Sequence, residues 1–231
     1  SVRQAGFRFS IHSSLLRNRE VFRVVRLMIP RSISIAVGQV GFLAATFFAS
    51  VLASGTLAAY TLANNIQSVP LGLFGVAFSL AAFPTLSAFA ARDERQRFSL
   101  TLAKTAKQML FFVLPIGFMI IALRAQIVRI ILGTGEFDWN DTRMTFEILG
   151  VLSASLFAQS LIPLFARAFF SLQDTKTPLF IALASEVLHI VFLIIGIRTW
   201  GVAALPLSFS IASVFNFALL YIFLRKRLDA W

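Results

Sequence analysis

Long apolar stretches separated by short polar segments dominate the chain. The longest runs from Ser32 to Ala91, sixty residues without one Asp, Glu, Lys or Arg. One membrane crossing takes about 20 apolar residues, whereas a helix face that meets water carries charged side chains. This stretch therefore predicts two membrane-crossing helices, joined where Ser54 and Gly55 interrupt the apolar pattern.

The same pattern continues to the end of the chain and predicts six transmembrane helices in all. The expected spans are residues 32–53, 57–91, 99–132, 144–166, 178–197 and 200–224. Together they form a transmembrane region over residues 32–224. Before it, residues 1–31 mix arginine with apolar residues and predict a basic amphipathic segment at the cytoplasmic membrane interface. After it, residues 225–231 form a basic cytoplasmic tail. The fold class is accordingly all-α, in a polytopic membrane protein.

The positions of the cations predict the orientation, because loops rich in Lys and Arg stay on the cytoplasmic side. With six spans and the N-terminus inside, the inner segments are residues 1–31, 92–107, 167–176 and 225–231. These segments hold 17 of the 21 Lys and Arg residues, and the outer segments hold 4. Gaining or losing one span would invert every later segment. Both ends of this chain are therefore expected in the cytoplasm.

Composition narrows the functional classes. The chain is 58% apolar and 13% charged, whereas a soluble domain is about 45–50% apolar and about 25% charged. The absence of Cys excludes disulfides and thiol chemistry, and two His residues leave little for a metal centre. No set of nucleophile, base and acid stands out, so no enzymatic activity, cofactor or metal is expected. The net charge of +11 sits at the ends of apolar segments, which favours contact with membrane lipids and argues against a nucleic-acid partner.

Four amide side chains lie within the first two predicted spans. Gln39 is in the first, and Asn64, Asn65 and Gln67 crowd the second just before Pro70. Amides in hydrocarbon are costly unless they are hydrogen-bonded or face water. One interpretation is hydrogen bonding between helices. The other, which we adopt as a prediction, is that these four side chains line a substrate cavity.

Proline and glycine residues in the second span predict bends. The candidate hinge residues are Pro70, Gly72, Gly75 and Pro84. Proline removes a helix hydrogen bond, and the freed carbonyl must be satisfied by other protein groups or water within a membrane. The spacing of the glycines also resembles a phosphate-binding loop, but the lysine of that motif is missing.

Glu186 and His189 are the only ionisable pair inside a predicted apolar span. Their i, i+3 spacing places them on one helix face. A buried carboxylate tends to take up a proton, and a neighbouring imidazolium holds it ionised. The pair is therefore a candidate proton-coupling site. The alternative is a structural pairing inside the helix bundle.

Two segments resemble a known family. Residues 64–77 with residues 82–87 resemble the second helix of the C-terminal lobe of MurJ/MviN lipid II flippases, which belong to the MOP exporter superfamily. Residues 167–178 read Arg-Ala-Phe-Phe-Ser-Leu-Gln-Asp-Thr-Lys-Thr-Pro and resemble the turn motif of that family. This motif supplies four further candidate residues, namely Arg167, Asp174, Thr175 and Pro178.

The resemblance implies one six-helix lobe of a MOP-type, MATE-like transporter in the bacterial inner membrane. Its substrate would be lipid II or a related polyprenyl-pyrophosphate glycan, moved by alternating access. A first six-helix lobe would be its partner, and because the chain opens with Ser1 we expect that lobe upstream.

This sequence departs from the family pattern at three places. Asn65 stands where many members carry Arg, Ala45 where some carry Asp, and His189 where Asn is common. Glu186 and His189 would then be substitute groups that couple transport to a proton gradient or the membrane potential. Two alternatives stay open: a multidrug or polysaccharide exporter of the same superfamily, and a non-transporting membrane scaffold, since one lobe alone encloses no cavity.

Overall fold

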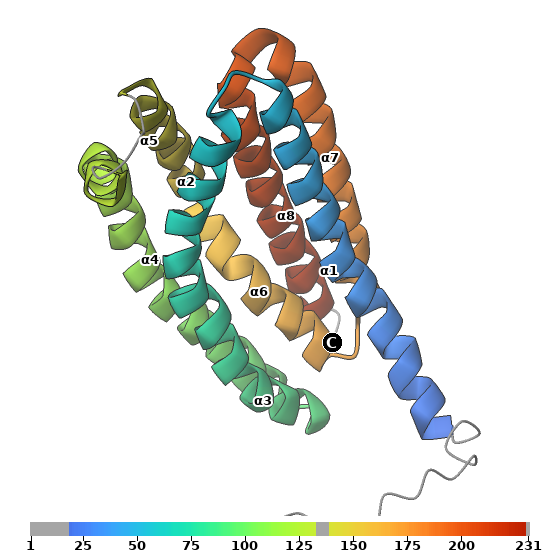
Figure 1. Cartoon of the computed structure of the whole chain (residues 1–231). Helices are drawn as coiled ribbons and strands as arrows, with labels where there is room; N and C mark the ends of the chain where they lie inside the picture. The colour runs from blue at the N-terminus through green and yellow to red at the C-terminus, as the bar shows by residue number, and fades with distance from the viewer. Residues whose placement is uncertain (1–18, 133–138, 230–231) are drawn as a thin grey trace, which may run out of the picture.

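The computed structural model describes residues 19–132 and 139–229, which form helices joined by short turns (Figure 1). The α-helices are α1 (Arg19–Val51), α2 (Thr56–Pro70), α3 (Ala77–Ala91), α4 (Arg95–Leu132), α5 (Trp139–Ala154), α6 (Leu156–Ser171), α7 (Lys176–Trp200) and α8 (Ala204–Asp229). A π-helical segment, η3 (Leu71–Val76), joins α2 to α3, and a 3₁₀ turn, η4 (Gly201–Ala203), joins α7 to α8.

These helices form six columns. Helices α2 and α3 run on through η3 as one column, and α5 and α6 form another that is bent by 47°. Three segments of the described chain are long and apolar enough to cross a membrane: Thr56–Ala91, Arg95–Ile131 and Lys176–Asp229. The last contains both α7 and α8, which fold back on each other beyond η4 (Figure 1). The predicted all-α, polytopic, six-helix fold is confirmed.

A short turn lies at the first predicted connection. Helix α1 ends at Val51 and α2 begins at Thr56. Gly55 precedes α2 with a φ of 82°, a conformation that L side chains rarely adopt. The charge-free stretch is thus divided next to Ser54 and Gly55.

Other boundaries differ from the predicted ones. Helix α1 is continuous across residue 31, so the predicted interfacial segment and the first span share one helix. Helix α8 continues to Asp229, so the predicted tail is largely helical. The fourth predicted span, residues 144–166, is interrupted at Ser155, between α5 and α6. The sequence offers no proline or glycine at that residue, so a break was not predicted there.

The interior consists of two apolar clusters. The first joins α1, α2, α4 and α5 and includes the small residues Ala45, Ala49, Ala59 and Ala63, all buried. Small residues let membrane helices approach closely. Within a membrane, van der Waals packing rather than exclusion of water holds the helices together. The second joins α3, α4, α6 and α8 around large side chains such as Phe169. The outer surface remains strongly apolar, as a bilayer requires.

Candidate functional site

The structure brings Glu186 and His189 into contact within α7. His189 Nδ1 lies 2.8 Å from Glu186 Oε1, and only 3% of the His189 side chain and 18% of the Glu186 side chain are exposed. The i, i+3 spacing therefore gives a direct interaction rather than a shared face alone. A polar group in an apolar layer is costly unless it is hydrogen-bonded, and His189 gives the Glu186 carboxyl group such a partner.

Glu186 faces α1 at a position that has no side chain. Gly41 of α1 is buried, and a Cβ added there would overlap the Glu186 carboxylate. Tyr60 of α2 lies close enough to interact with charge on Glu186. On the other side, the Phe209 ring of α8 meets His189 edge-on, with 5.7 Å between ring centroids. The pair is thus held between α1, α2 and α8.

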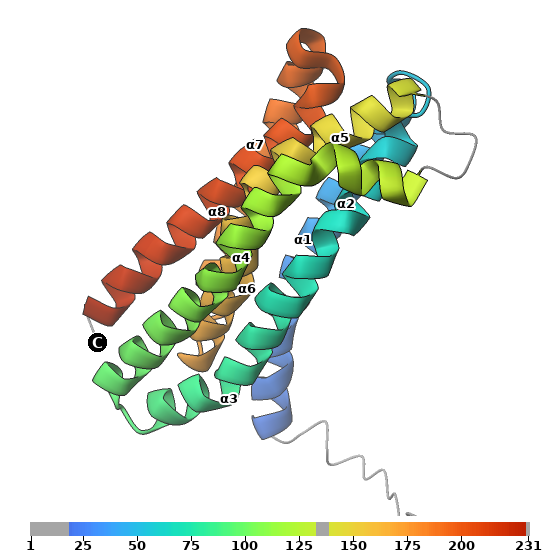
Figure 2. The same ribbon diagram turned by 90° about the vertical axis from the view of Figure 1, so that its left-hand side faces the viewer.

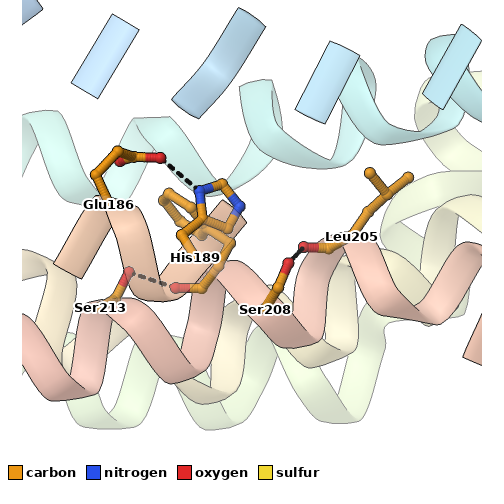
Figure 3. Close-up of polar contacts among 6 residues, drawn as sticks. Glu186, His189, Leu205, Ser208 and Ser213 are labelled. Carbon is orange, nitrogen blue, oxygen red and sulfur yellow. Dashed lines mark hydrogen bonds and ion pairs between the residues drawn. The ribbon is translucent and has the colours of Figure 1, made fainter. Parts of the chain in front are cut away.

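The serines of α8 near the pair are satisfied within their own helix (Figure 3). Ser208 donates to the Leu205 carbonyl at 3.1 Å, and Ser213 donates to the Phe209 carbonyl at 2.8 Å. His189 Nε2, by contrast, finds no hydrogen-bond partner among the residues the structure describes. Among the described residues, the carboxyl group of Glu186 therefore engages one ring nitrogen, and the other is buried without a partner.

The four amides predicted to line a cavity differ in burial. Gln39 on α1 and Asn65 on α2 are exposed, and Asn64 is half-buried. Gln67 is buried, and its Nε2 donates to the Leu152 carbonyl of α5 at 3.2 Å. For Gln67 the structure therefore favours the alternative of hydrogen bonding between helices. A cavity-lining role for Gln39, Asn64 and Asn65 stays a prediction.

A hydrogen-bonded relay closes the break between α5 and α6, and sequence reasoning missed it. Gln159 Nε2 donates to Ser155 Oγ at 2.7 Å, Ser155 lies 3.0 Å from Ser210 Oγ, and Ser210 donates to the Val151 carbonyl at 3.1 Å. The next carbonyl, that of Leu152, accepts from Gln67 Nε2 at 3.2 Å, from Ser155 Oγ at 3.0 Å and from the Ser155 backbone N–H at 3.2 Å. A helix broken within a membrane needs such partners for its freed carbonyls. The one available signal was the cluster of serines around residue 154.

Three of the four candidate hinge residues lie at the π-helical segment η3: Gly72 and Gly75 are within it, and Pro70 directly precedes it. Pro70 is the last residue of α2 and is buried, and η3 begins directly after it. Gly75 packs on α6, where an added Cβ would lie 3.2 Å from Ser160 Cα, whereas nothing lies within 4 Å of one added at Gly72. Pro84 lies inside an uninterrupted α3. π-helical turns often occur at functional sites, and a hinge at η3 stays a prediction.

The motif residues build the connection between α6 and α7. Asp174 Oδ1 accepts hydrogen bonds from the backbone N–H groups of Lys176, at 3.1 Å, and Thr177, at 3.0 Å, and its Oδ2 accepts one from Thr177 Oγ1 at 2.7 Å. The carboxylate thus caps the first turn of α7. Thr175 directly precedes α7, and Pro178 is buried in its first turn.

Arg167 ties α6 to α3. Its Nη1 donates to the Ser79 hydroxyl and, at 3.3 Å, to the Pro163 carbonyl. The guanidinium therefore links two helices at the end of the bundle where the motif turn lies.

Comparison with known proteins gives the family. A sequence model described as lipid II flippase MurJ matches residues 1–230. The chain belongs to the MurJ lipid II flippase family. A relative from Bdellovibrio bacteriovorus, named as a probable lipid II flippase MurJ, is 31% identical over 207 residues, which are 90% of this chain and 40% of that protein. The chain therefore spans about two fifths of the length of this MurJ relative.

Solved structures share the fold. A lipid II flippase MurJ in an inward closed conformation superposes with a TM-score of 0.77 at 23% identity, covering 95% of this chain and 46% of that one. A MATE transporter in a bent conformation superposes with a TM-score of 0.83 at 14% identity, covering 92% of this chain and 47% of that one. The predicted MOP-type lobe is thus confirmed as the fold of this MurJ family member.

Proposed function

We propose that this chain is one six-helix lobe of a flippase for lipid II or a related polyprenyl-pyrophosphate glycan, working by alternating access in the bacterial inner membrane. The observation that carries the proposal is the family match over residues 1–230. The lobe covers about half of a MurJ structure, so a second lobe is required to enclose a cavity. The distribution of Lys and Arg supports cytoplasmic positions for both ends of this chain.

Within that proposal, Glu186 and His189 form the coupling site. With the carboxylate ionised and the imidazole neutral, the pair carries one negative charge in an apolar layer, which is unfavourable. Uptake of one proton makes the pair neutral overall. The neutral pair allows the backbone of α1 at Gly41 to pack directly against the Glu186 carboxyl group of α7. Loss of the proton favours entry of water and separation of α1 from α7.

The decisive experiment is complementation of flippase-depleted cells by the full-length gene, followed by measurement of lipid II exposure on the outer leaflet. We expect rescue by the wild type. The double substitution Glu186→Gln with His189→Gln should retain membrane expression and lose the response of flipping to an imposed pH gradient. Glu147→Gln is the matched control, because Glu147 is an exposed carboxylate paired with Arg143.

Two results would count against these proposals separately. Failure of the wild type to rescue, with normal expression, would contradict lipid II flipping. Rescue by the wild type together with an unchanged pH response in the double variant would contradict coupling at Glu186 and His189 alone.

A multidrug or polysaccharide exporter of the same superfamily is the second candidate. The higher TM-score to a MATE transporter and Asn65, at a position where the family often has Arg, favour it. Drug efflux from cells that express the full-length gene, without rescue of flippase depletion, would support this candidate over the first. A protein that neither rescues nor exports would fit the scaffold alternative.

A further inference from the structure

A groove runs between the first half of α4 and the last half of α8. Figure 2 shows these two segments at the same end of the bundle, with the C-terminal end of α8 close to the beginning of α4. Both helices also pack on α6, and they make few contacts with each other. The groove between them has a volume of about 450 Å³ and includes Phe165 of α6 in its lining.

The floor of this groove is apolar and tightly packed. Leu102 of α4, Phe165 of α6 and Leu224 of α8 line it and are 6%, 6% and 1% exposed. Ala103 and Ala106 leave room along the α4 wall. A groove with such walls in a membrane protein is filled by hydrocarbon, since an empty one forfeits dispersion contacts on every side.

The mouth of the groove carries charge. Arg95 lines it from α4, and Arg225 and Asp229 line it from α8. Arg95 Nη2 lies 3.9 Å from Asp229 Oδ1, with the two side chains 40% and 72% exposed, so this pair is loose and solvated. The three groups leave a net positive charge at the mouth. Ser99 and Tyr221 add hydroxyl donors to the same lining.

Cations outnumber acids in the two chain segments that meet here. Arg92 and Arg97 lie near Arg95 in the sequence, together with Asp93 and Glu94, and Lys226 and Arg227 follow Arg225. The distribution of cations predicts that this end faces the cytoplasm, where the leaflet surface is anionic and attracts Lys and Arg. A guanidinium beside an apolar groove at headgroup depth matches a lipid with a phosphate at one end and a chain at the other.

We propose that the α4–α8 groove is a binding site for an anionic phospholipid. Its phosphate is held at the mouth by Arg225 and Arg95 with help from the Tyr221 and Ser99 hydroxyls. One acyl chain lies along Ala103 and over the apolar floor. A zwitterionic lipid would fill the same floor, but it would gain less from the positive mouth. This site is separate from the Glu186–His189 pair and does not depend on the proposed transport function.

The test measures which lipids the purified full-length protein retains. The protein is loaded with equal amounts of phosphatidylglycerol and phosphatidylcholine and examined by native mass spectrometry. We expect the wild type to retain phosphatidylglycerol preferentially. The double variant Arg95→Gln with Arg225→Gln should lower that preference by about tenfold. Arg92→Gln with Lys226→Gln is the matched control, since it removes the same charge from side chains outside the groove lining and should keep the preference.

A groove-filling variant tests the position of the chain. Ala103→Leu leaves all charges in place and should lower retention of both lipids, which also keeps the test decisive if the arginine double variant does not fold. Equal loss of preference in the control and arginine variants would overturn the proposal, because the effect would then be one of overall charge. Unchanged retention in Ala103→Leu would overturn it too. So would displacement of the lipid by excess inorganic phosphate, which would indicate a phosphate site rather than a lipid site.

Discussion

Gly41 of α1 lies so close to the Glu186 carboxylate of α7 that a Cβ at residue 41 would overlap the carboxylate. The contact joins the Glu186–His189 pair of α7 to the backbone of the neighbouring helix α1. Any side chain at residue 41 must push α1 away or turn Glu186 from its position beside His189.

The first prediction follows from this contact. Gly41→Ala should destabilise the protein by about 1–3 kcal/mol through overpacking and should reduce transport. Gly38→Ala, one helical turn earlier, is the control, because nothing lies within 4 Å of a Cβ added there. Thermal unfolding in detergent and lipid II exposure in cells measure the two effects. Equal behaviour of the two variants would show that the Gly41 contact does not matter.

The sequence could predict a contact of this site when the two residues are close in the sequence, and it could not when they lie on different helices. The Glu186–His189 contact follows from their spacing, because i, i+3 residues meet on any helix. The turn at Gly55 follows from a glycine in a polar break. The approach of Gly41 to Glu186 joins residues on α1 and α7, and no local pattern in the sequence indicates which face of α1 turns toward α7.

The break between α5 and α6 illustrates the same limit. The Val151 carbonyl at the break accepts from Ser210 of α8, and the Leu152 carbonyl accepts from Gln67 of α2 as well as from Ser155; Gln67 and Ser210 are distant in sequence. Without knowledge of those partners, residues 144–166 predict one straight span. Gln67 was grouped with Asn64 and Asn65 by residue type, whereas helix packing turns it toward α5 and leaves Asn65 exposed.

The relay at the break gives the second prediction. Ser155→Ala should remove both the acceptor of Gln159 and the contact to Ser210, and should destabilise the protein by about 0.6–1.7 kcal/mol, the range for hydrogen bonds between membrane helices. Ser68→Ala is the control, because the Ser68 hydroxyl is exposed and bonds only to the Asn65 carbonyl of its own helix. Urea or thermal unfolding in detergent measures the difference. A control as destabilised as Ser155→Ala would contradict a special role for the relay.

The cap of α7 gives the third prediction. Asp174→Ala should cost about 1 kcal/mol of stability, because two backbone N–H groups and the Thr177 hydroxyl lose their acceptor. Asp174→Asn retains one acceptor oxygen and should lose clearly less. The comparison is made by thermal unfolding. Since the residue belongs to the α6–α7 turn, we expect transport per folded molecule to stay unchanged in Asp174→Asn, and a specific loss of transport there would point to a role beyond capping.

The amides of α2 give the last prediction. Burial distinguishes an amide that bonds a neighbouring helix from one that could face the substrate, whereas residue type does not. Gln67→Leu removes the donor to the Leu152 carbonyl and should lower stability by about 0.6–1.7 kcal/mol. Asn65→Leu replaces an exposed amide and should leave stability unchanged, while it lowers transport if Asn65 faces the substrate. Unfolding in detergent measures the stability of each variant, and lipid II exposure measures its transport independently. If Gln67→Leu lowered transport with no loss of stability, Gln67 would belong to the substrate path after all. If Asn65→Leu changed neither quantity, the exposed face of α2 would meet lipid rather than substrate.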